Sequence, residues 1–215
     1  MTPPKQQVTF SAQAILFDND GVLSDSVASV NACWRRWAGI YGLDGAKVTA
    51  GIHGKPARES IAALLPDVDT EEAFAVLEDL EVAAAGDTKP MPGALDLLAT
   101  LPRSRWIVVT SGTPRLASAR LHHIGIDPPA MITADDVPRG KPDPAPYLAA
   151  AAALGVDPTA CLAFEDTTPG IQSARQAGAT VIAIGHHAQG AEYGIDDLRE
   201  VRAAETDDGL LVTIG

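Results

Sequence analysis

The chain has 215 residues, 46% of them hydrophobic, and a formal net charge of -12. This length suits one large domain or a core domain with a small insertion, and the hydrophobic fraction is sufficient for a buried core. The negative charge argues against a nucleic-acid partner, because nucleic acid binds a basic surface. It also means that any phosphate site must be a local cationic pocket or a metal site.

Nothing in the sequence indicates export or membrane insertion. The N-terminal segment MTPPKQQVTFSAQ lacks the apolar region of a signal peptide, and no apolar run is long enough to span a bilayer. The two cysteines, Cys33 and Cys161, lack the spacing of a zinc site or a disulfide framework. We therefore expect a cytoplasmic protein with no membrane partner, present as a monomer or a small homo-oligomer.

Short apolar runs that end in polar residues recur along the chain and predict buried strands. These runs occupy residues 14–17, 106–110, 161–164 and 180–184, with a weaker one at 130–133. Helical spacing that ends near a glycine predicts helices between them. These helices are expected over 114–124, 144–154 and 169–177. Strands that alternate with helices predict a parallel sheet covered by helices on both faces.

The segment 26–91 has helical periodicity and no convincing strand. Within it, Trp34, Trp37 and Tyr41 share one helix face and are expected to build the core of this segment. We expect Asp25 and Ser26 to cap its first helix. The sequence thus predicts a core domain formed by residues 1–25 and 92–215, with an all-helical insertion at 26–91. In the last stretch, a helix is expected at 195–201 and a strand at 210–214.

The residues suited to chemistry follow the predicted strands or stand in one loop before a helix. They are Asp18, Asp20, Ser111, Gly112, Lys141, Glu165 and Asp166. The carboxyl ends of parallel strands meet at one edge of the sheet, where open α/β sheets bind ligands. We therefore expect these residues to converge on a single site.

The acidic residues of this set favour phosphoryl transfer assisted by a metal ion. Asp18, Asp20 and Asp166 would repel one another unless a cation lay among them, and oxygen ligands of this kind suit Mg2+. A carboxylate can attack phosphorus, and a second one can exchange protons with the leaving group and with water. Asp18, at the end of a strand, is the better-fixed nucleophile, and Asp20 suits the acid/base role. Lys141 and the hydroxyl of Ser111 are expected to bind the phosphate.

Four segments resemble the motifs of the haloacid dehalogenase superfamily of phosphatases, in the same order. They are FDNDGVLSDS at 17–26, VTSG at 109–112, GKPDP at 140–144 and FEDTTPGI at 164–171. The resemblance implies a Rossmann-like three-layer α/β/α core with an inserted all-α helical cap. It implies Mg2+ held by Asp18, the main-chain oxygen of Asp20 and Asp166, with Glu165 supporting the metal. It also implies an aspartyl-phosphate intermediate on Asp18.

The insertion contains His53, Gly54 and Lys55, which resemble the cap loop of the sugar-phosphate phosphatase branch. In that branch the loop contacts the leaving group, so these residues are candidates for substrate recognition. The resemblance implies that the substrate is a small phosphorylated metabolite, such as a sugar or polyol phosphate.

Three alternatives stay open at this point. A β-phosphoglucomutase-like phosphotransferase would carry a histidine at the position of Val30 and an arginine at that of Ala57, although Arg58 is adjacent. A phospho-receiver domain would have no helical insertion and a shorter chain. A catalytically inactive binding protein with the same fold is disfavoured by the intact acidic residues and Lys141.

Overall fold

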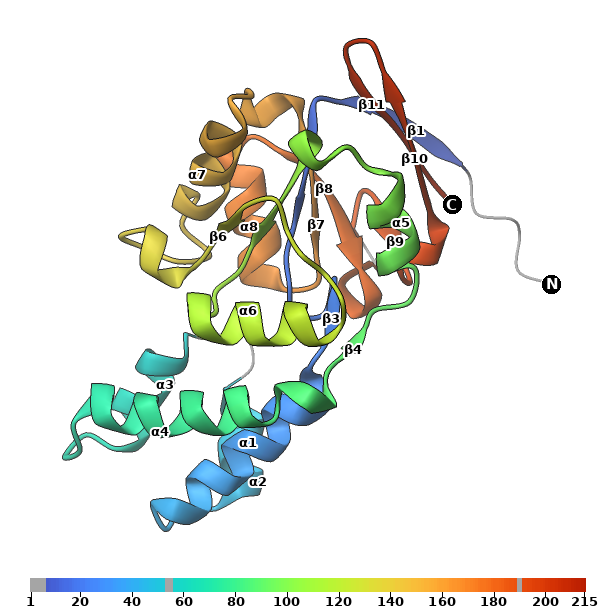
Figure 1. Ribbon diagram of the computed structural model, residues 1–215. Coiled ribbons are helices and arrows are strands. Elements are labelled where there is room, and N and C mark those ends of the chain that lie inside the picture. The colour runs from blue at the N-terminus through green and yellow to red at the C-terminus, as the bar shows by residue number, and fades with distance from the viewer. Residues whose placement is uncertain (1–6, 53–55, 189–190) are drawn as a thin grey trace.

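The computed structural model describes residues 7–52, 56–188 and 191–215 of the chain, and the structural statements below refer to these residues. A parallel six-stranded sheet with strand order β6-β5-β2-β7-β8-β9 forms the centre of the molecule (Figure 1). Its strands are β2 (Ala14–Phe17), β5 (Trp106–Val109), β6 (Met131–Ile132), β7 (Cys161–Glu165), β8 (Thr180–Ile184) and β9 (Gly194–Ile195). The five predicted strands are therefore confirmed, and β9 is an addition.

Helices cover both faces of this sheet, which gives the predicted three layers. They are α5 (Ala94–Thr100), α6 (Pro114–His123), α7 (Ala145–Leu154) and α8 (Thr168–Ala177). The three predicted helices correspond to α6, α7 and α8. Local signals explain their ends: the side chains of Thr113 and Thr167 accept hydrogen bonds from the first turns of α6 and α8. Gly155 and Gly178 end α7 and α8 in left-handed backbone conformations.

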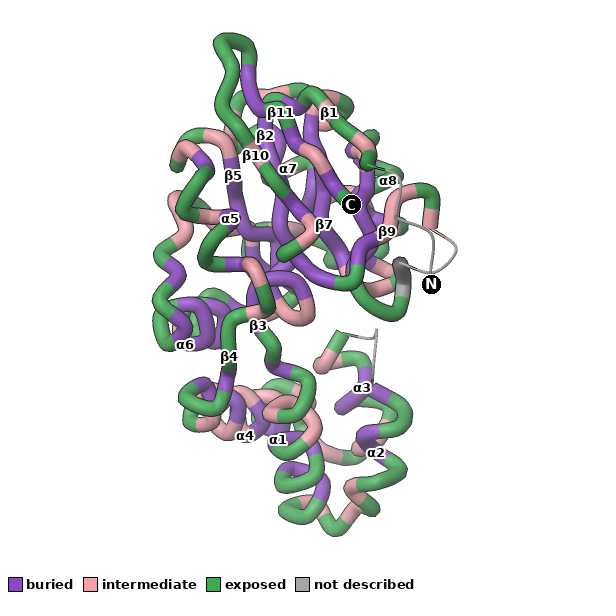
Figure 2. The backbone as a smooth tube through the Cα atoms, turned by 90° about the vertical axis from the view of Figure 1, so that its right-hand side faces the viewer, coloured by how far each residue is buried: buried purple, intermediate pink, exposed green. Residues whose placement is uncertain are grey.

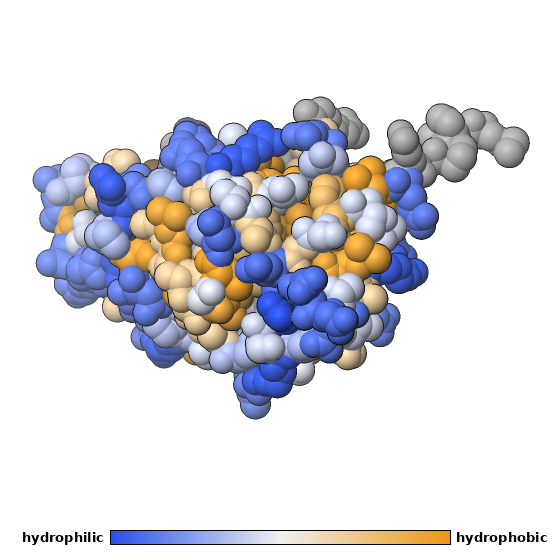
Figure 3. Space-filling view, turned by 90° about the horizontal axis from the view of Figure 1, so that it is seen from above, coloured by the Kyte–Doolittle hydropathy of each residue, from blue (hydrophilic) through white to orange (hydrophobic). Residues whose placement is uncertain are grey.

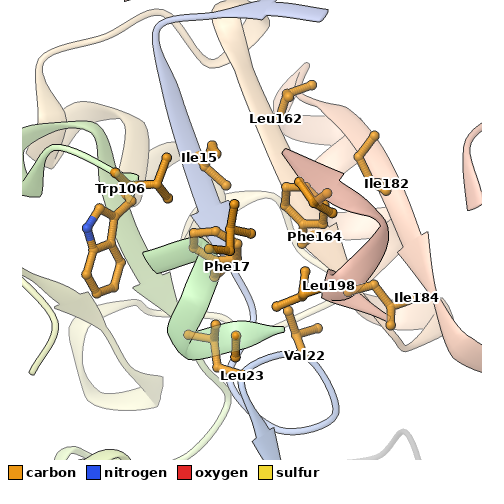
Figure 4. Close-up of a cluster of buried hydrophobic side chains, with 14 of the residues drawn as sticks. Ile15, Phe17, Val22, Leu23, Trp106, Leu162, Phe164, Ile182, Ile184 and Leu198 are labelled. Carbon is orange, nitrogen blue, oxygen red and sulfur yellow. The ribbon is translucent and has the colours of Figure 1, made fainter. Parts of the chain in front are cut away.

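The apolar strands separate two hydrophobic clusters, one on each face of the sheet. The first joins Phe17, Trp106 and Phe164 to residues of α5 and α6 (Figure 4), and the rings of Phe17 and Phe164 stack at 5.3 Å. The second packs α7 and α8 against the opposite face through Tyr147 and several alanines. The central strands are consequently buried throughout (Figure 2), which explains why they appear in the sequence as continuous apolar runs.

The segment 26–91 forms a separate helical layer, called the helical insertion below, with its own hydrophobic cluster. Its helices are α1 (Val27–Ile40), α2 (Gly45–Gly51), α3 (Ala57–Leu64) and α4 (Thr70–Ala83). The prediction for the aromatic residues of α1 is confirmed: Trp37 is fully buried, Trp34 is nearly so, and the Trp37 indole donates to the carbonyl of Ala73 at 2.8 Å.

One prediction for this segment was wrong, because it contains a short strand. Strand β4 (Lys89–Pro90) pairs antiparallel with β3 (Ser24–Asp25) where the chain enters and leaves the helical insertion. Two-residue strands leave almost no alternating pattern in a sequence, so the pairing becomes visible only in three dimensions. The two connecting segments thereby lie side by side at the edge of the core.

The N- and C-terminal segments form a second sheet that the sequence did not predict. Strands β1 (Val8–Ala12), β11 (Gly209–Ile214) and β10 (Val201–Thr206) pair antiparallel in the order β1-β11-β10. The strand predicted at 210–214 is confirmed as β11, but the helix predicted at 195–201 is wrong. That segment holds β9, a short 3-10 helix (Leu198–Glu200) and the start of β10. The end of the molecule opposite the helical insertion shows apolar patches among hydrophilic residues (Figure 3).

The remaining short elements are 3-10 helices. They are η1 (Ala85–Asp87), η2 (Arg103–Arg105), η3 (Ala134–Asp136), η4 (Pro158–Ala160), η5 (Gly185–Ala188) and η6 (Leu198–Glu200). Among the described residues, no helix combines the length and the hydropathy that a membrane span requires.

Substitution of Leu77 tests whether the helical insertion depends on its own core. Leu77 is fully buried in the cluster of the helical insertion. Leu77→Ala should lower the free energy of unfolding by about 2–5 kcal/mol, because it removes buried methyl groups and leaves a cavity. Leu95→Ala is the matched control, since Leu95 is 43% exposed on α5. Its effect should stay within about 0.5 kcal/mol in urea denaturation. Equal losses for the two variants would contradict the assignment.

Candidate active site

Of the polar residues predicted to meet, Asp18, Lys141, Glu165 and Asp166 lie together at the carboxyl ends of the central strands, at the end of the sheet that faces the helical insertion (Figure 1). Asp18 follows β2, and its backbone N–H donates to the carbonyl of Phe164 in the neighbouring strand at 3.0 Å. Glu165 ends β7, and Asp166 follows it. The sheet itself therefore fixes the backbone that carries all three carboxylates.

Lys141 lies at the centre of this group and is only 8% exposed. Its ammonium is 2.5 Å from Asp18 Oδ1, 2.5 Å from Glu165 Oε1 and 3.0 Å from the carbonyl oxygen of Val109. It thus joins the ends of β2, β5 and β7 from the loop that precedes α7. A buried lysine is stable only when it is paired in this way, so it is not a solvated loop residue.

Glu165 is fully buried, and both of its oxygens accept hydrogen bonds. Oε1 accepts from Lys141 and from the hydroxyl of Tyr147 at 2.7 Å. Oε2 accepts from the backbone N–H groups of Asp166 and Thr167 and from the Thr167 hydroxyl, at 3.1 to 3.3 Å. These bonds occupy the acceptor capacity of the carboxylate. The geometry favours a role for Glu165 in holding Lys141 and the Asp166 loop, rather than as a direct metal ligand.

Burial shifts the pKa values of the charged side chains in this site. Desolvation raises the pKa of the Asp18 carboxyl well above its usual value, against the lowering effect of Lys141. Burial, and then the charge of Glu165, raises the pKa of Asp166 to about 7. Burial alone would lower the pKa of the Lys141 ammonium, but the charges of Asp18 and Glu165 raise it. Full ionisation of the three carboxylates would therefore place more negative charge in this buried group than the one ammonium of Lys141 can balance.

The excess negative charge and an unpaired oxygen suit a divalent cation. One oxygen each from Asp18, Glu165 and Asp166 lie within 4.8 Å of one another. Asp166 Oδ1 is buried and has no hydrogen-bond partner among the described residues. Gly21 leaves room beside this carboxylate, since a Cβ there would lie 1.9 Å from Asp166 Oδ2. Oxygen donors of this kind match the preference of Mg2+, so the residues present fit that ion.

The Asp20 side chain has its own hydrogen-bond partners. Its Oδ1 accepts from the hydroxyl of Ser26 at 2.6 Å and from Arg120 Nη1 at 2.8 Å, while Asn19 Nδ2 lies 3.4 Å from Oδ2. The carboxylate oxygens that lie within reach of one another are those of Asp18, Glu165 and Asp166, whereas the Asp20 side chain binds Ser26 and Arg120. Ser26 is the N-cap residue of α1, as expected, but its side chain makes no capping bond and binds Asp20 instead.

Two of the expected phosphate-binding residues, Ser111 and Gly112, lie at the start of the loop after β5. Ser111 is exposed at the surface, and the Gly112 N–H donates to the Thr110 hydroxyl at 3.0 Å. The loop residues His53, Gly54 and Lys55 lie outside the described residues.

Sequence reasoning missed several residues that complete the site. Tyr147 and Thr167 hold Glu165, Asn19 organises the loop between the two aspartates, and Arg120 contacts Asp20. The Asn19 carbonyl accepts from three N–H groups, those of residues 22, 23 and 24. Thr167 belongs to the fourth motif and Asn19 to the first. The motifs therefore include both residues, but their spacing does not indicate that Thr167 holds Glu165 or that Asn19 organises the loop.

The comparison with known proteins agrees with this geometry. The sequence model of the haloacid dehalogenase-like hydrolases matches residues 12–178. The chain belongs to this family. It is 38% identical over 178 residues to hexitol phosphatase A of Escherichia coli K12, covering 80% of this chain and 82% of that protein. It is 34% identical over 206 residues to glycerol-1-phosphate phosphohydrolase 2 of Saccharomyces cerevisiae, covering 90% and 80% respectively.

Among solved structures, β-phosphoglucomutase from Clostridium difficile matches this hydrolase with a TM-score of 0.75 at 23% identity, covering 89% of this chain and 93% of that one. At this identity the likeness shows the fold alone. The predicted superfamily, the Rossmann-like α/β fold and the phosphatase type of enzyme are confirmed by the family match and the named relatives.

Two glycines with similar backbones allow a test of the space beside Asp166. Gly21 (φ +89) and Gly42 (φ +69) both have left-handed conformations, but a Cβ at Gly42 would meet nothing within 4 Å. Gly42→Ala should cost only the backbone strain of about 1–2 kcal/mol and leave hydrolysis of p-nitrophenyl phosphate unchanged. Gly21→Ala must displace Asp166, and a misplacement of this size should lower kcat/KM about 100-fold. Similar activity in the two variants would show that Asp166 need not stay where the structure places it.

Proposed function

We propose that this hydrolase cleaves phosphomonoesters of small sugars or polyols through an aspartyl-phosphate on Asp18, with Asp20 as general acid and base. The observation that carries the proposal is the buried contact of Asp18 with Lys141, beside Asp166, whose Oδ1 has no hydrogen-bond partner among the described residues and fits Mg2+. The named relatives that act on hexitol and glycerol phosphates support the substrate class.

Asp18 has the environment that a nucleophilic carboxylate needs. Lys141 holds Oδ1, and the pairing of the backbone with β7 fixes the residue, so Oδ2 is the oxygen available to attack phosphorus. The Lys141 ammonium also offsets repulsion between the carboxylate and an incoming phosphate. We assign Ser111, Gly112 and Lys141 to phosphate binding.

Asp18, the main-chain oxygen of Asp20 and Asp166 would hold the Mg2+ ion, with Glu165 supporting the Asp166 loop. When bound, the ion supplies positive charge that lowers the repulsion between nucleophile and phosphate. Asp166 Oδ1 has no hydrogen-bond partner among the described residues, so it is the oxygen most available as a ligand to the ion.

Asp20 is placed for proton transfer at the same rim. Ser26 and Arg120 hold Oδ1, which leaves Oδ2 to give a proton to the leaving oxygen and to take one from the attacking water. The two steps form and then hydrolyse the acyl phosphate of Asp18, releasing the alcohol and then inorganic phosphate.

We propose that residues 26–91 act as a cap over the core formed by residues 1–25 and 92–215. In this proposal His53, Gly54 and Lys55 contact the leaving group and select the substrate. The position where a mutase would carry a histidine holds Val30, which packs against the hydrophobic cluster of the helical insertion. Arg58 is engaged within that same segment, by Glu71 at 2.8 Å and by the ring of Phe74 at 3.8 Å. Both observations favour hydrolysis over mutase chemistry.

The deciding experiment measures phosphate release from hexose, hexitol, pentose and glycerol phosphates, β-glucose 1-phosphate and a nucleotide, with and without Mg2+. The wild type should release phosphate from sugar or polyol phosphates only with Mg2+. Asp18→Asn should lose activity by about 10^4-fold or more while its thermal unfolding is preserved, because an amide is not a nucleophile here. Residual turnover at the wild-type rate in that variant would refute the nucleophile. Conversion of β-glucose 1-phosphate to the 6-phosphate without release would instead identify a mutase.

A binding measurement tests the metal site without relying on activity. Saturation at about 100 times the dissociation constant of Mg2+ should stabilise the wild type by about 2.7 kcal/mol, seen as a rise in Tm. Asp166→Asn should lose this rise, and without Mg2+ it should be at least as stable as the wild type, because it removes a buried repulsive charge.

The matched control for the metal site is Asp127→Asn, since the Asp127 side chain is 89% exposed and pairs with Arg103. This variant should keep the full response to Mg2+. A rise in Tm for Asp166→Asn equal to that of the wild type would place the ion elsewhere.

A further inference from the structure

One arginine of the core connects Asp20 to the helical insertion. Arg120 lies on α6, is only 3% exposed, and is a hundred residues from Asp20 in the sequence. Its Nη1 donates to Asp20 Oδ1 at 2.8 Å, and its Nη2 donates to Glu81 Oε1 on α4 at 3.1 Å. The two Nη groups of one planar guanidinium therefore bind one carboxylate of the core domain and one of the helical insertion.

Stability alone does not account for this arrangement. Glu81 is 7% exposed, and burial raises the pKa of its carboxyl despite the opposing effect of Arg120. Arg120 Nε is buried without a hydrogen-bond partner among the described residues. Buried ion pairs contribute little to folding compared with apolar residues of similar volume, and an unpaired buried donor is unfavourable. We therefore look to the contact with Asp20, rather than to folding stability, for the function of Arg120.

A second arginine on the same helix provides the contrast. Arg115 also pairs with α4, through Glu78 at 3.3 Å and Asp79 at 2.6 Å. Its side chain is 54% exposed, and within the described part of the chain it pairs with these two carboxylates rather than with a residue of the candidate site. Two arginines of α6 therefore bind the helical insertion, but of these two only Arg120 also binds Asp20.

The bonds to Asp20 are unequal between its two oxygens. Oδ1 accepts the two short bonds from Ser26 and Arg120, whereas the one contact of Oδ2 among the described residues is that to Asn19 at 3.4 Å. Donors on one oxygen fix the plane of the carboxylate and leave the other oxygen to exchange a proton. We propose that Arg120 is the positioning residue of Asp20, and that Glu81 sets the position of Arg120 when the helical insertion rests on the core. This inference rests on the acid/base role proposed for Asp20.

The dependence on the leaving group tests the proposal. Departure of an alkoxide needs a proton from Asp20, whereas p-nitrophenolate leaves without one. The comparison uses kcat/KM, which reports the steps up to departure of the leaving group, for glycerol 1-phosphate and p-nitrophenyl phosphate. Arg120→Met should lower kcat/KM about 100-fold for the glycerol ester and less than about 10-fold for the aryl ester, because general acid catalysis contributes factors of this size.

Matched variants separate positioning from a structural role. Arg115→Met breaks pairs between the same two helices and should leave the ratio of the two kcat/KM values at that of the wild type. Glu81→Gln should shift the ratio in the same direction as Arg120→Met, and adding it to Arg120→Met should shift the ratio no further. Equal losses on both esters in Arg120→Met, or an unchanged ratio, would overturn the proposal.

Two further variants keep the test decisive. If Arg120→Met does not fold, the double variant Arg120→Met/Glu81→Leu removes both buried charges together, and it should show the same selective loss on the glycerol ester. Asp20→Asn serves as the reference for loss of the acid. A selective loss in Asp20→Asn without one in the Arg120 variants would overturn the positioning role alone. No selective loss in Asp20→Asn would mean that the acid/base assignment itself fails.

Discussion

The ion pair between Lys141 and Asp18 is the interaction on which the site depends. A buried ammonium is stable only if the free energy of losing its hydration is offset by close partners. Here the partners come from the ends of three strands, namely Asp18, Glu165 and the carbonyl of Val109. One cation thereby aligns segments that are distant in the sequence. The same cation binds one oxygen of the carboxylate proposed as the nucleophile and leaves the other oxygen available for attack.

The parallel sheet explains why polar residues gather at only one end of such an apolar core. The central strands are buried on both faces, so they cannot carry charges along their length without large desolvation costs. Charges are tolerated where the strands end, and in a parallel sheet those ends coincide. The paired strands β3 and β4 leave from the same edge, so the helical insertion is placed over the charged rim. The site and the helical insertion thus lie at the same end of the sheet for one reason, which is that the parallel strands end there.

The sequence predicted the elements whose signals are local, and it missed those that depend on distant pairing. The apolar runs at 14–17 and 161–164 identified β2 and β7, because doubly buried strands are continuous apolar runs. Strand β1 pairs with β11 across almost the whole chain, and neither alternation nor length distinguishes a short edge strand of this kind. The segment at 195–201 has helix-forming residues, but pairing to β8 and β11 overrides that preference.

The motif residues were predictable because their spacing is a chemical signature, whereas Arg120 and Glu81 lie on helices where charged residues are expected to face solvent. Their positions nevertheless contain a signal. Arg120 lies four residues after the buried Leu116, on the apolar side of α6, and Glu81 lies four residues after the buried Leu77 on α4. A charge on the apolar face of an amphipathic helix must find an opposite charge when the helix packs. Two helices that each carry one such charge, of opposite sign, therefore indicate a buried contact between them, and in this hydrolase that contact ends on the carboxylate assigned to proton transfer.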